Sequence, residues 1–189
     1  GADYLTDVHV YDPSAGADGS WSELTSIAGT PPSKRYTATA VEIGGKAYIY
    51  GGFYPGPTYR NDVVVFDPAG SNGQGEWSHP SATKTSSMES SAAVLNGKMY
   101  VSGGGWTSEF FSYNPSNDTW SSASAMPALA LTEHATAVIG NKLYSFGGMM
   151  LQPGGGAVKY GMMNVYDPAT GNWSLIGSSP STPPPMFWH

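Results

Sequence analysis

Glu133 and His134 form an adjacent pair of titratable residues directly before a run of β-type residues. A carboxylate beside an imidazole can accept and donate protons, which is the basis of general acid–base catalysis. One dipeptide of this kind is weak evidence for an active site, and the remaining histidines are widely separated: His9, His79 and His189. We therefore treat the pair as candidate binding residues and predict no catalytic residue in this chain.

The sequence holds few other reactive side chains. The absence of cysteine excludes disulfides, thiolate metal ligands and thiol chemistry. Asp12 and Asp18 occur in "DPSAGADGSW", but the other acidic ligands of a calcium loop are missing from this stretch. We predict that the chain binds no metal ion and no cofactor.

The composition is that of a turn-rich protein with little charge. The 189 residues include 25 glycines and 15 prolines, and only 12% are charged. The net charge of −6 argues against a nucleic-acid partner, and no apolar run is long enough to span a membrane. The scarcity of Lys and Arg beside abundant Ser, Thr and Gly slightly favours an extracellular or cell-surface location.

One pattern repeats along the chain. Three copies end in a pair of glycines, and their sequences are "GKAYIYGG", "GKMYVSGG" and "NKLYSFGG". A strand-ending "VYDP", "VFDP" or "SYNP" then precedes a tryptophan, and the four tryptophans are Trp21, Trp77, Trp120 and Trp173. A period of about 50 residues is typical of repeat architectures, so the repeat decides the fold class ahead of local propensity.

Each complete repeat predicts four antiparallel strands. Two β-type runs flank a dipeptide that tolerates positive φ at both positions of a type I′ turn, and these dipeptides are Gly44-Gly45, Asn96-Gly97 and Gly140-Asn141. A third run ends at a proline, which cannot donate to a ladder. The tryptophan marks a fourth strand. Four antiparallel strands per repeat describe one blade of a β-propeller.

The glycine pair, the "Y/F-D/N-P" element and the tryptophan, in this order, resemble kelch repeats. The period of about 50 residues fits kelch repeats better than the shorter WD40 repeats, and no Trp-Asp dipeptide occurs. The resemblance implies an all-β fold of kelch-type propeller blades and covers nearly the whole chain. It says little about function, because kelch propellers include enzymes, adaptors and surface proteins.

The repeats divide the chain into an incomplete set of blades. We expect half a blade with only its third and fourth strands at 1–30, and a linker with the start of another blade at 179–189. Between them we expect three complete blades, at 31–80, 81–126 and 127–178. Propellers have about four to eight blades, so the ring is incomplete within this chain. Further blades from the same or another chain would complete it. We also expect the glycine pairs to lie where neighbouring backbone or the tryptophan leaves no room for a Cβ.

Antiparallel geometry places the long loops on one face of the propeller and the hairpin turns on the other. Loops that carry function are held by a rigid scaffold, so the long-loop face is the candidate binding face. Its candidate residues are Arg35, Tyr59, Arg60, Trp106, Glu133, His134 and Lys159. The resemblance also implies a structural alternative for Arg35 and His134, since kelch repeats carry Arg or His before the first strand for packing between blades.

We predict a non-catalytic module that binds a protein or a glycan, or that serves in an assembly, through the long-loop face. The alternative is a segment of a kelch-propeller enzyme similar to galactose oxidase or to a sialic-acid mutarotase, with its catalytic residues mostly outside this chain. The lack of cysteine departs from galactose oxidase, which needs a Cys-linked tyrosine.

Two glycosylation sequons begin at Asn117 and Asn172, both in predicted turns opposite the long loops. In protein secreted by a eukaryotic cell, we expect Asn117 to be glycosylated more completely than Asn172, because Trp173 at the middle of the second sequon should turn inward to pack. Glycopeptide mass spectrometry of natively sourced protein measures both occupancies. Bare asparagines would remove the residue-level support for secretion, and a glycan on Asn172 alone would show that its turn is misplaced.

Overall fold

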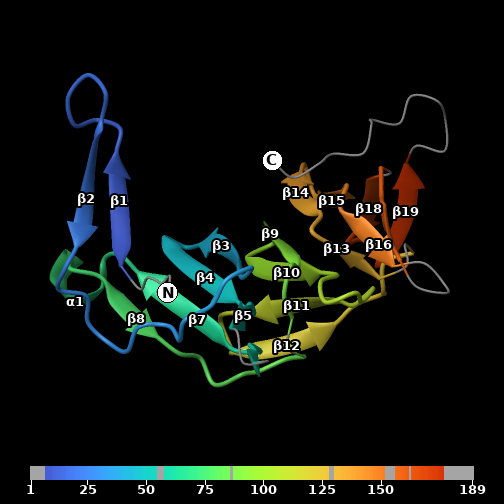
Figure 1. Cartoon of the computed structure of the whole chain (residues 1–189), viewed down its shortest axis with the longest axis horizontal. Helices are drawn as coiled ribbons and strands as arrows, with labels where there is room; N and C mark the ends of the chain where they lie inside the picture. Colours follow the sequence, from blue (N-terminus) through green and yellow to red (C-terminus); the bar gives the residue numbers. More distant parts are fainter. Residues whose placement is uncertain are drawn as a thin grey trace.

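The computed structural model describes residues 7–54, 58–85, 87–127, 130–151, 156–161 and 163–176. The predicted linker at 179–189 lies outside these residues. The regular secondary structure of these residues consists almost entirely of antiparallel strands, and Figure 1 shows the sheets following one another along an open arc. The prediction of an all-β fold with four-stranded blades and an incomplete ring is confirmed.

The sheets follow the chain in order. A two-stranded N-terminal hairpin contains β1 (Val8–Asp12) and β2 (Ser20–Leu24). The first blade contains, in spatial order, β3 (Thr39–Ile43), β4 (Lys46–Tyr50), β7 (Val63–Asp67) and β8 (Glu76–Ser78). The second blade contains β9 (Ser91–Leu95), β10 (Lys98–Ser102), β11 (Phe110–Asn114) and β12 (Thr119–Ser122). The third blade contains β14 (Ala135–Ile139), β15 (Lys142–Phe146), β18 (Met163–Asp167) and β19 (Asn172–Ile176).

Short elements occupy three places where the sequence predicts loops or turns. β5 (Phe53–Tyr54) pairs with β6 (Thr58–Tyr59), and a further sheet joins β13 (Leu131–Thr132), β16 (Met149–Leu151) and β17 (Ala157–Lys159). A helical turn, α1, spans Gly70–Gly73. These elements are two to four residues long, so they carry too few positions for a hydrophobic period to show.

The first strand of each blade lies on the inner side of the arc. Figure 1 shows β3, β9 and β14 on this side, with β8, β12 and β19 outside. The hairpins of the first two blades turn through two residues with positive φ, as type I′ turns require. In the third blade only Gly140 has positive φ, so this turn follows a type II′ pattern and its predicted type is wrong.

Aromatic side chains fill the junctions between sheets. The ring centroids of Trp120 and of Tyr50 in the preceding blade are 4.9 Å apart. The centroids of Trp173 and of Phe110, again in the preceding blade, are 4.8 Å apart. Both indole N–H groups donate to carbonyls of the segment that leads into their own blade, with N···O distances of 3.4 and 2.9 Å. The outer tryptophan of a blade therefore fixes that blade against its predecessor.

The first two glycine pairs lie where backbone from the next blade passes. Gly52 donates its N–H to the Ser87 carbonyl at 2.7 Å, and Gly104 donates to the Leu131 carbonyl at 2.8 Å. A Cβ at Gly51 would collide with the Ser87 carbonyl oxygen. Neighbouring backbone, rather than the tryptophan, therefore explains the glycines.

The third pair differs between its two members. A Cβ at Gly148 would collide with the Thr132 carbonyl oxygen, whereas a Cβ at Gly147 would meet nothing within 4 Å. Gly147 is explained by its φ of +74° alone, a conformation that side chains rarely adopt.

We expect Gly103→Ala to destabilise the chain more than Gly105→Ala. Both glycines have a φ of +55°, so the conformational cost is shared, but only the Cβ at Gly103 would collide with the Leu131 carbonyl. Overpacking of this kind costs about 1 to 3 kcal/mol beyond the shared cost. Urea unfolding of both variants measures the difference, and equal losses would refute the close-approach explanation.

Candidate functional site

Three equivalent residues form an inner rim where the blades meet: Thr37, Glu89 and Glu133. Each lies two positions before the first strand of its blade. The Glu89 N–H donates to the Thr37 carbonyl, and the Glu133 N–H donates to the Glu89 carbonyl, both at 3.1 Å. Backbone hydrogen bonds thus join the three blades in series at this rim.

The rim residues hold an uncommon backbone conformation. Their φ values are +56°, +57° and +55°, in the left-handed region that non-glycine residues rarely occupy. Such residues persist only where the surroundings determine them, and they gather at functional sites. The same conformation in three consecutive blades indicates a feature of the repeat that the inter-blade hydrogen bonds maintain.

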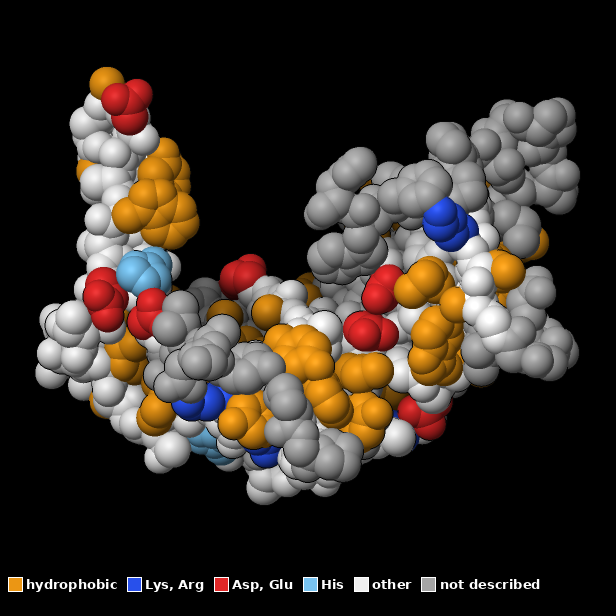
Figure 2. Space-filling model, viewed as in Figure 1, with side chains coloured by type: hydrophobic (Ala, Val, Ile, Leu, Met, Phe, Trp, Pro, Cys, Tyr) orange, Lys and Arg blue, Asp and Glu red, His pale blue; other side chains and the backbone are white. Residues whose placement is uncertain are grey.

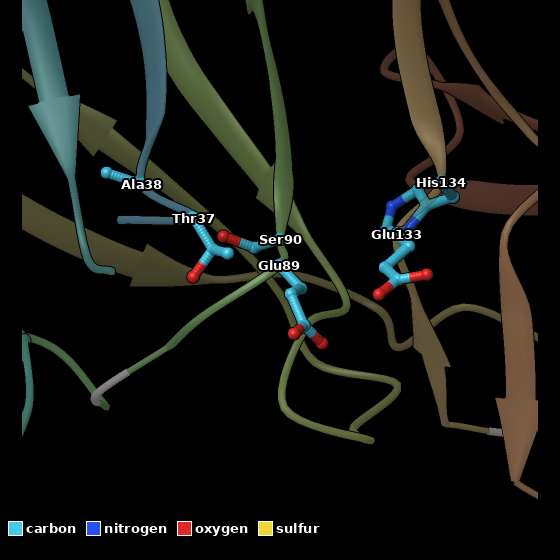
Figure 3. A pocket seen from close by; sticks show the side chains of 6 residues that line it. All are labelled: Thr37, Ala38, Glu89, Ser90, Glu133 and His134. Carbon is cyan, nitrogen blue, oxygen red and sulfur yellow. The ribbon is translucent and has the colours of Figure 1, made fainter. Parts of the chain in front are cut away.

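A pocket of about 420 Å³ opens at the inner rim (Figure 3). Its lining consists of the rim residues and the residue that follows each of them: Thr37, Ala38, Glu89, Ser90, Glu133 and His134. Figure 2 shows acidic side chains along the hollowed inner side of the arc. The pocket is therefore built by three blades together and carries two carboxylates.

The two carboxylates influence each other. Glu89 Oε2 accepts a hydrogen bond of 2.9 Å from the hydroxyl of Thr132, a residue with no exposed surface. Burial, followed by the negative charge of Glu89, raises the pKa of Glu133 above its ordinary value. A cation placed between the two groups would relieve this repulsion.

His134 lies beneath the rim with 7% of its surface exposed. Its Nε2 is 2.9 Å from the Ser102 hydroxyl, and its Nδ1 is buried with no hydrogen-bond partner among the described residues. Burial lowers the pKa of His134 to about 4, so the ring is neutral at physiological pH.

Arg35 is bound within the first blade. Its guanidinium donates two hydrogen bonds of 2.9 Å to the Asp62 carboxylate and one of 3.0 Å to the Gly51 carbonyl. Its side chain is 7% exposed. Although burial raises the pKa of Asp62, the hydrogen bonds and charge of Arg35 outweigh it and lower this pKa. These contacts place Arg35 among the supports of one blade, rather than between blades.

The other predicted binding residues lie outside the pocket lining. Tyr59 is 49% exposed, and its ring lies 5.1 Å from Phe53. Arg60 donates its N–H to the Gly52 carbonyl, and its Nε is buried without a partner among the described residues. Trp106 is half-buried with a φ of +61°, and Lys159 is exposed in β17. Of the seven candidates, the pocket brings together Glu133 and His134.

Sequence reasoning missed Thr37, Glu89 and Ser90. Aligning the copies two residues before each first strand would have paired Glu89 with Glu133, and this spacing was the available signal. Both predicted glycosylation residues, Asn117 and Asn172, are exposed.

Neither a metal cluster nor a membrane helix is found in the part of the chain that the structure describes. No group of three or more His, Asp or Glu side chains there could hold a metal ion. Within the same residues, no helix is long and apolar enough to cross a membrane.

The successive blades and their shared rim define a segment of a β-propeller. Residues 1–148 match the family described as the KLHDC2/KLHL20/DRC7 Kelch-repeats domain, and the chain belongs to this family. The resemblance to kelch repeats is therefore confirmed.

Individual relatives agree with this assignment. The chain is 31% identical over 102 residues to Kelch-like protein terF of Aspergillus terreus, which covers 49% of this chain and 22% of that protein. It is 31% identical over 125 residues to a putative F-box/kelch-repeat protein of Arabidopsis thaliana, covering 61% of this chain and 32% of that protein. The matched segments thus span less than a third of either relative.

The solved structure of YjhT is similar in fold. The superposition has a TM-score of 0.72 at 21% identity and covers 93% of this chain and 60% of YjhT. At this identity the likeness supports the propeller fold alone.

We expect Arg35→Met to lower the free energy of unfolding by about 2 to 4 kcal/mol, because it leaves the half-buried Asp62 carboxylate without its partner. Lys46→Met is the matched control. It removes the 2.8 Å ion pair between Lys46 and Asp67, in which the lysine side chain is 44% exposed. Because solvent screens an exposed pair, this variant should lose much less stability. Urea unfolding at pH 7 compares the two variants.

The Arg35 contribution should also depend on pH. Because the pKa of Asp62 is lowered on folding from its ordinary 3.8, the pair stabilises the fold above that pH and the stabilisation is lost as pH falls below it. Equal losses for the two variants at pH 7, or a gap that widens on acidification, would contradict the assignment.

Proposed function

We propose that the chain is a protein-binding segment of a kelch propeller and contacts its partner through the inner rim and the adjoining loops. The observation that carries the proposal is the rim pocket, to which three blades each contribute two neighbouring residues. Pockets formed where structural units converge are common ligand sites. Kelch-repeat relatives in a fungus and a plant are consistent with a shared interaction scaffold.

A protein partner fits the pocket better than a glycan. The described lining residues include two carboxylates and no tryptophan or tyrosine on which a sugar ring could stack. Nearby, Tyr36 and Tyr59 are 41% and 49% exposed. Amphipathic side chains of this kind are enriched at protein interfaces. The exposed aromatic residues would lie at the margin of the contact and the rim at its centre.

Catalysis has less support than binding at this pocket. Burial lowers the pKa of His134 to about 4, so the ring is neutral above that pH. Its Nε2 is already hydrogen-bonded to Ser102. Glu133 has a raised pKa, which suits a general acid, but no second group is within hydrogen-bonding distance of its carboxylate among the described contacts. An enzymatic role would therefore need groups beyond the residues that the structure describes.

The two ends of the arc support a second role in assembly with further blades. Trp21 of the N-terminal hairpin is 69% exposed, whereas the equivalent Trp77 is 8% exposed. At the other end, Ile139, Leu175 and Ile176 are 65%, 47% and 51% exposed. Ile139 and Ile176 are equivalent to Leu95 and Ala123 of the second blade, which pack in one apolar cluster with the third blade. Blades from the same longer chain or from another chain would cover the exposed side chains.

Selection of phage-displayed random peptides on the chain tests the proposed binding face. Selected peptides that carry a photocrosslinker should label the rim and the loops at 58–60 and 103–109. Cross-links at the hairpin turns 44–45 and 96–97, which lie on the opposite face, would place the binding site elsewhere. Failure of every selected peptide to bind better than its scrambled version would refute the proposal.

A further inference from the structure

We propose that the rim pocket binds the basic side chain of a lysine or arginine supplied by the partner protein. The inference rests on the proposed function, since it names the chemical group that the same site would recognise. It stands on two independent observations, the paired carboxylates of the rim and the unpartnered nitrogen of His134.

The charge of the pocket favours a cation. Glu89 and Glu133 are the charged residues among the six described residues that line it, and these six include no lysine or arginine. Figure 3 shows both carboxylates on the same side of the pocket. Glu89 is held in place by the 2.9 Å hydrogen bond from Thr132. Two carboxylates that share a pocket attract a positive group and disfavour an acidic one.

The hydrogen-bonding pattern of His134 points to a donor. We assign the single proton of the Ser102 hydroxyl to the 3.3 Å hydrogen bond with the Ser91 carbonyl. In this assignment Ser102 accepts from His134 Nε2–H at 2.9 Å and from the Thr136 hydroxyl at 3.2 Å. A neutral imidazole with its proton on Nε2 has a free acceptor at Nδ1. Figure 3 shows the ring extending from the start of β14 toward the pocket. The wall of the pocket thus offers a buried acceptor whose partner is not among the described residues.

These groups match a basic side chain in detail. Lysine brings three N–H donors and arginine five, and neither brings an acceptor. The Glu89 and Glu133 carboxylates and His134 Nδ1 are acceptors, and the buried Ser90 hydroxyl, which has no partner among the described residues, can also accept. A ligand with only donors would bind the two carboxylates directly, and it suits the two buried acceptors in the wall behind them. An acidic side chain would set acceptors against acceptors, and an amide would bring an acceptor beside its two donors.

The test uses three capped tripeptides as probes: acetyl-Gly-Lys-Gly-amide, acetyl-Gly-Arg-Gly-amide and the same peptide with norleucine at its centre. Titration of the chain by ¹H–¹⁵N NMR should shift the Glu89, Ser90 and Glu133 amides with the two basic peptides, with a Kd on the order of 10 mM or below. Norleucine has the same length without the charge and should leave these amides unmoved.

Substitutions sharpen the assignment. Glu133→Gln and Glu89→Gln should each weaken binding of the lysine peptide by at least about 10-fold. Glu42→Gln, in the hairpin of the opposite face, is the matched control and should leave the affinity unchanged. A Glu133→Asp variant keeps the charge and should retain more affinity than Glu133→Gln, which separates loss of charge from loss of folding.

The outcomes distinguish this inference from the proposed function. Equal binding of the norleucine and lysine peptides, no shift with either basic peptide, or full affinity in both Gln variants would overturn the basic-side-chain assignment, even where photocrosslinks still map to the rim. Larger rim shifts with calcium chloride than with the lysine peptide would also overturn it, in favour of a metal site. Cross-links away from the rim, with the lysine peptide still binding there, would refute the proposed function alone.

Discussion

The close passage of one blade's backbone over the end of its neighbour's second strand governs this structure. At each junction a segment leading into the next blade brings a carbonyl oxygen so near the glycine pair that a Cβ would collide with it. The same carbonyls accept the N–H groups of Gly52 and Gly104. Because an orphaned buried N–H is costly, this contact both excludes side chains and fixes the distance between blades. The aromatic packing of Trp120 and Trp173 can form only at that distance.

The inner rim follows from the same constraint. Once backbone hydrogen bonds set the spacing at the glycine pairs, the residue two positions before each first strand lies beside its counterpart in the next blade. The Thr37, Glu89 and Glu133 backbones then bond in series, and their left-handed φ values are maintained by contacts on both sides. The hydrogen bonds use only backbone atoms, so the side chains can differ in type within the limits that the left-handed conformation sets. A repeat that holds its rim through the main chain can thus change its binding chemistry without changing its fold.

The sequence allowed the blades to be predicted because their signals are local and repeated. The turn dipeptides, the strand-ending prolines and the tryptophans each act within a few residues, and all recur with one period. The hydrogen-bond partners of Arg35 could not be predicted from such local signals. Its partners, Gly51 and Asp62, are 16 and 27 residues away, so their meeting depends on how the first blade folds back on itself. The turn type at Gly140-Asn141 was also predicted incorrectly, because a Gly-Asn dipeptide is compatible with more than one type of tight turn.

The candidate site was harder to predict because it belongs to no single repeat. Glu133 and His134 drew attention as neighbours in the chain, yet their side chains have different surroundings in the structure. His134 extends beneath the rim to Ser102 of the preceding blade, whereas Glu133 shares its pocket with Glu89, 44 residues earlier (133 − 89 = 44). The carboxylate pair arises only when two blades lie side by side at the spacing set by the glycine contacts. A function at this rim is therefore a property of the blade junction, and it depends on each junction being correctly formed.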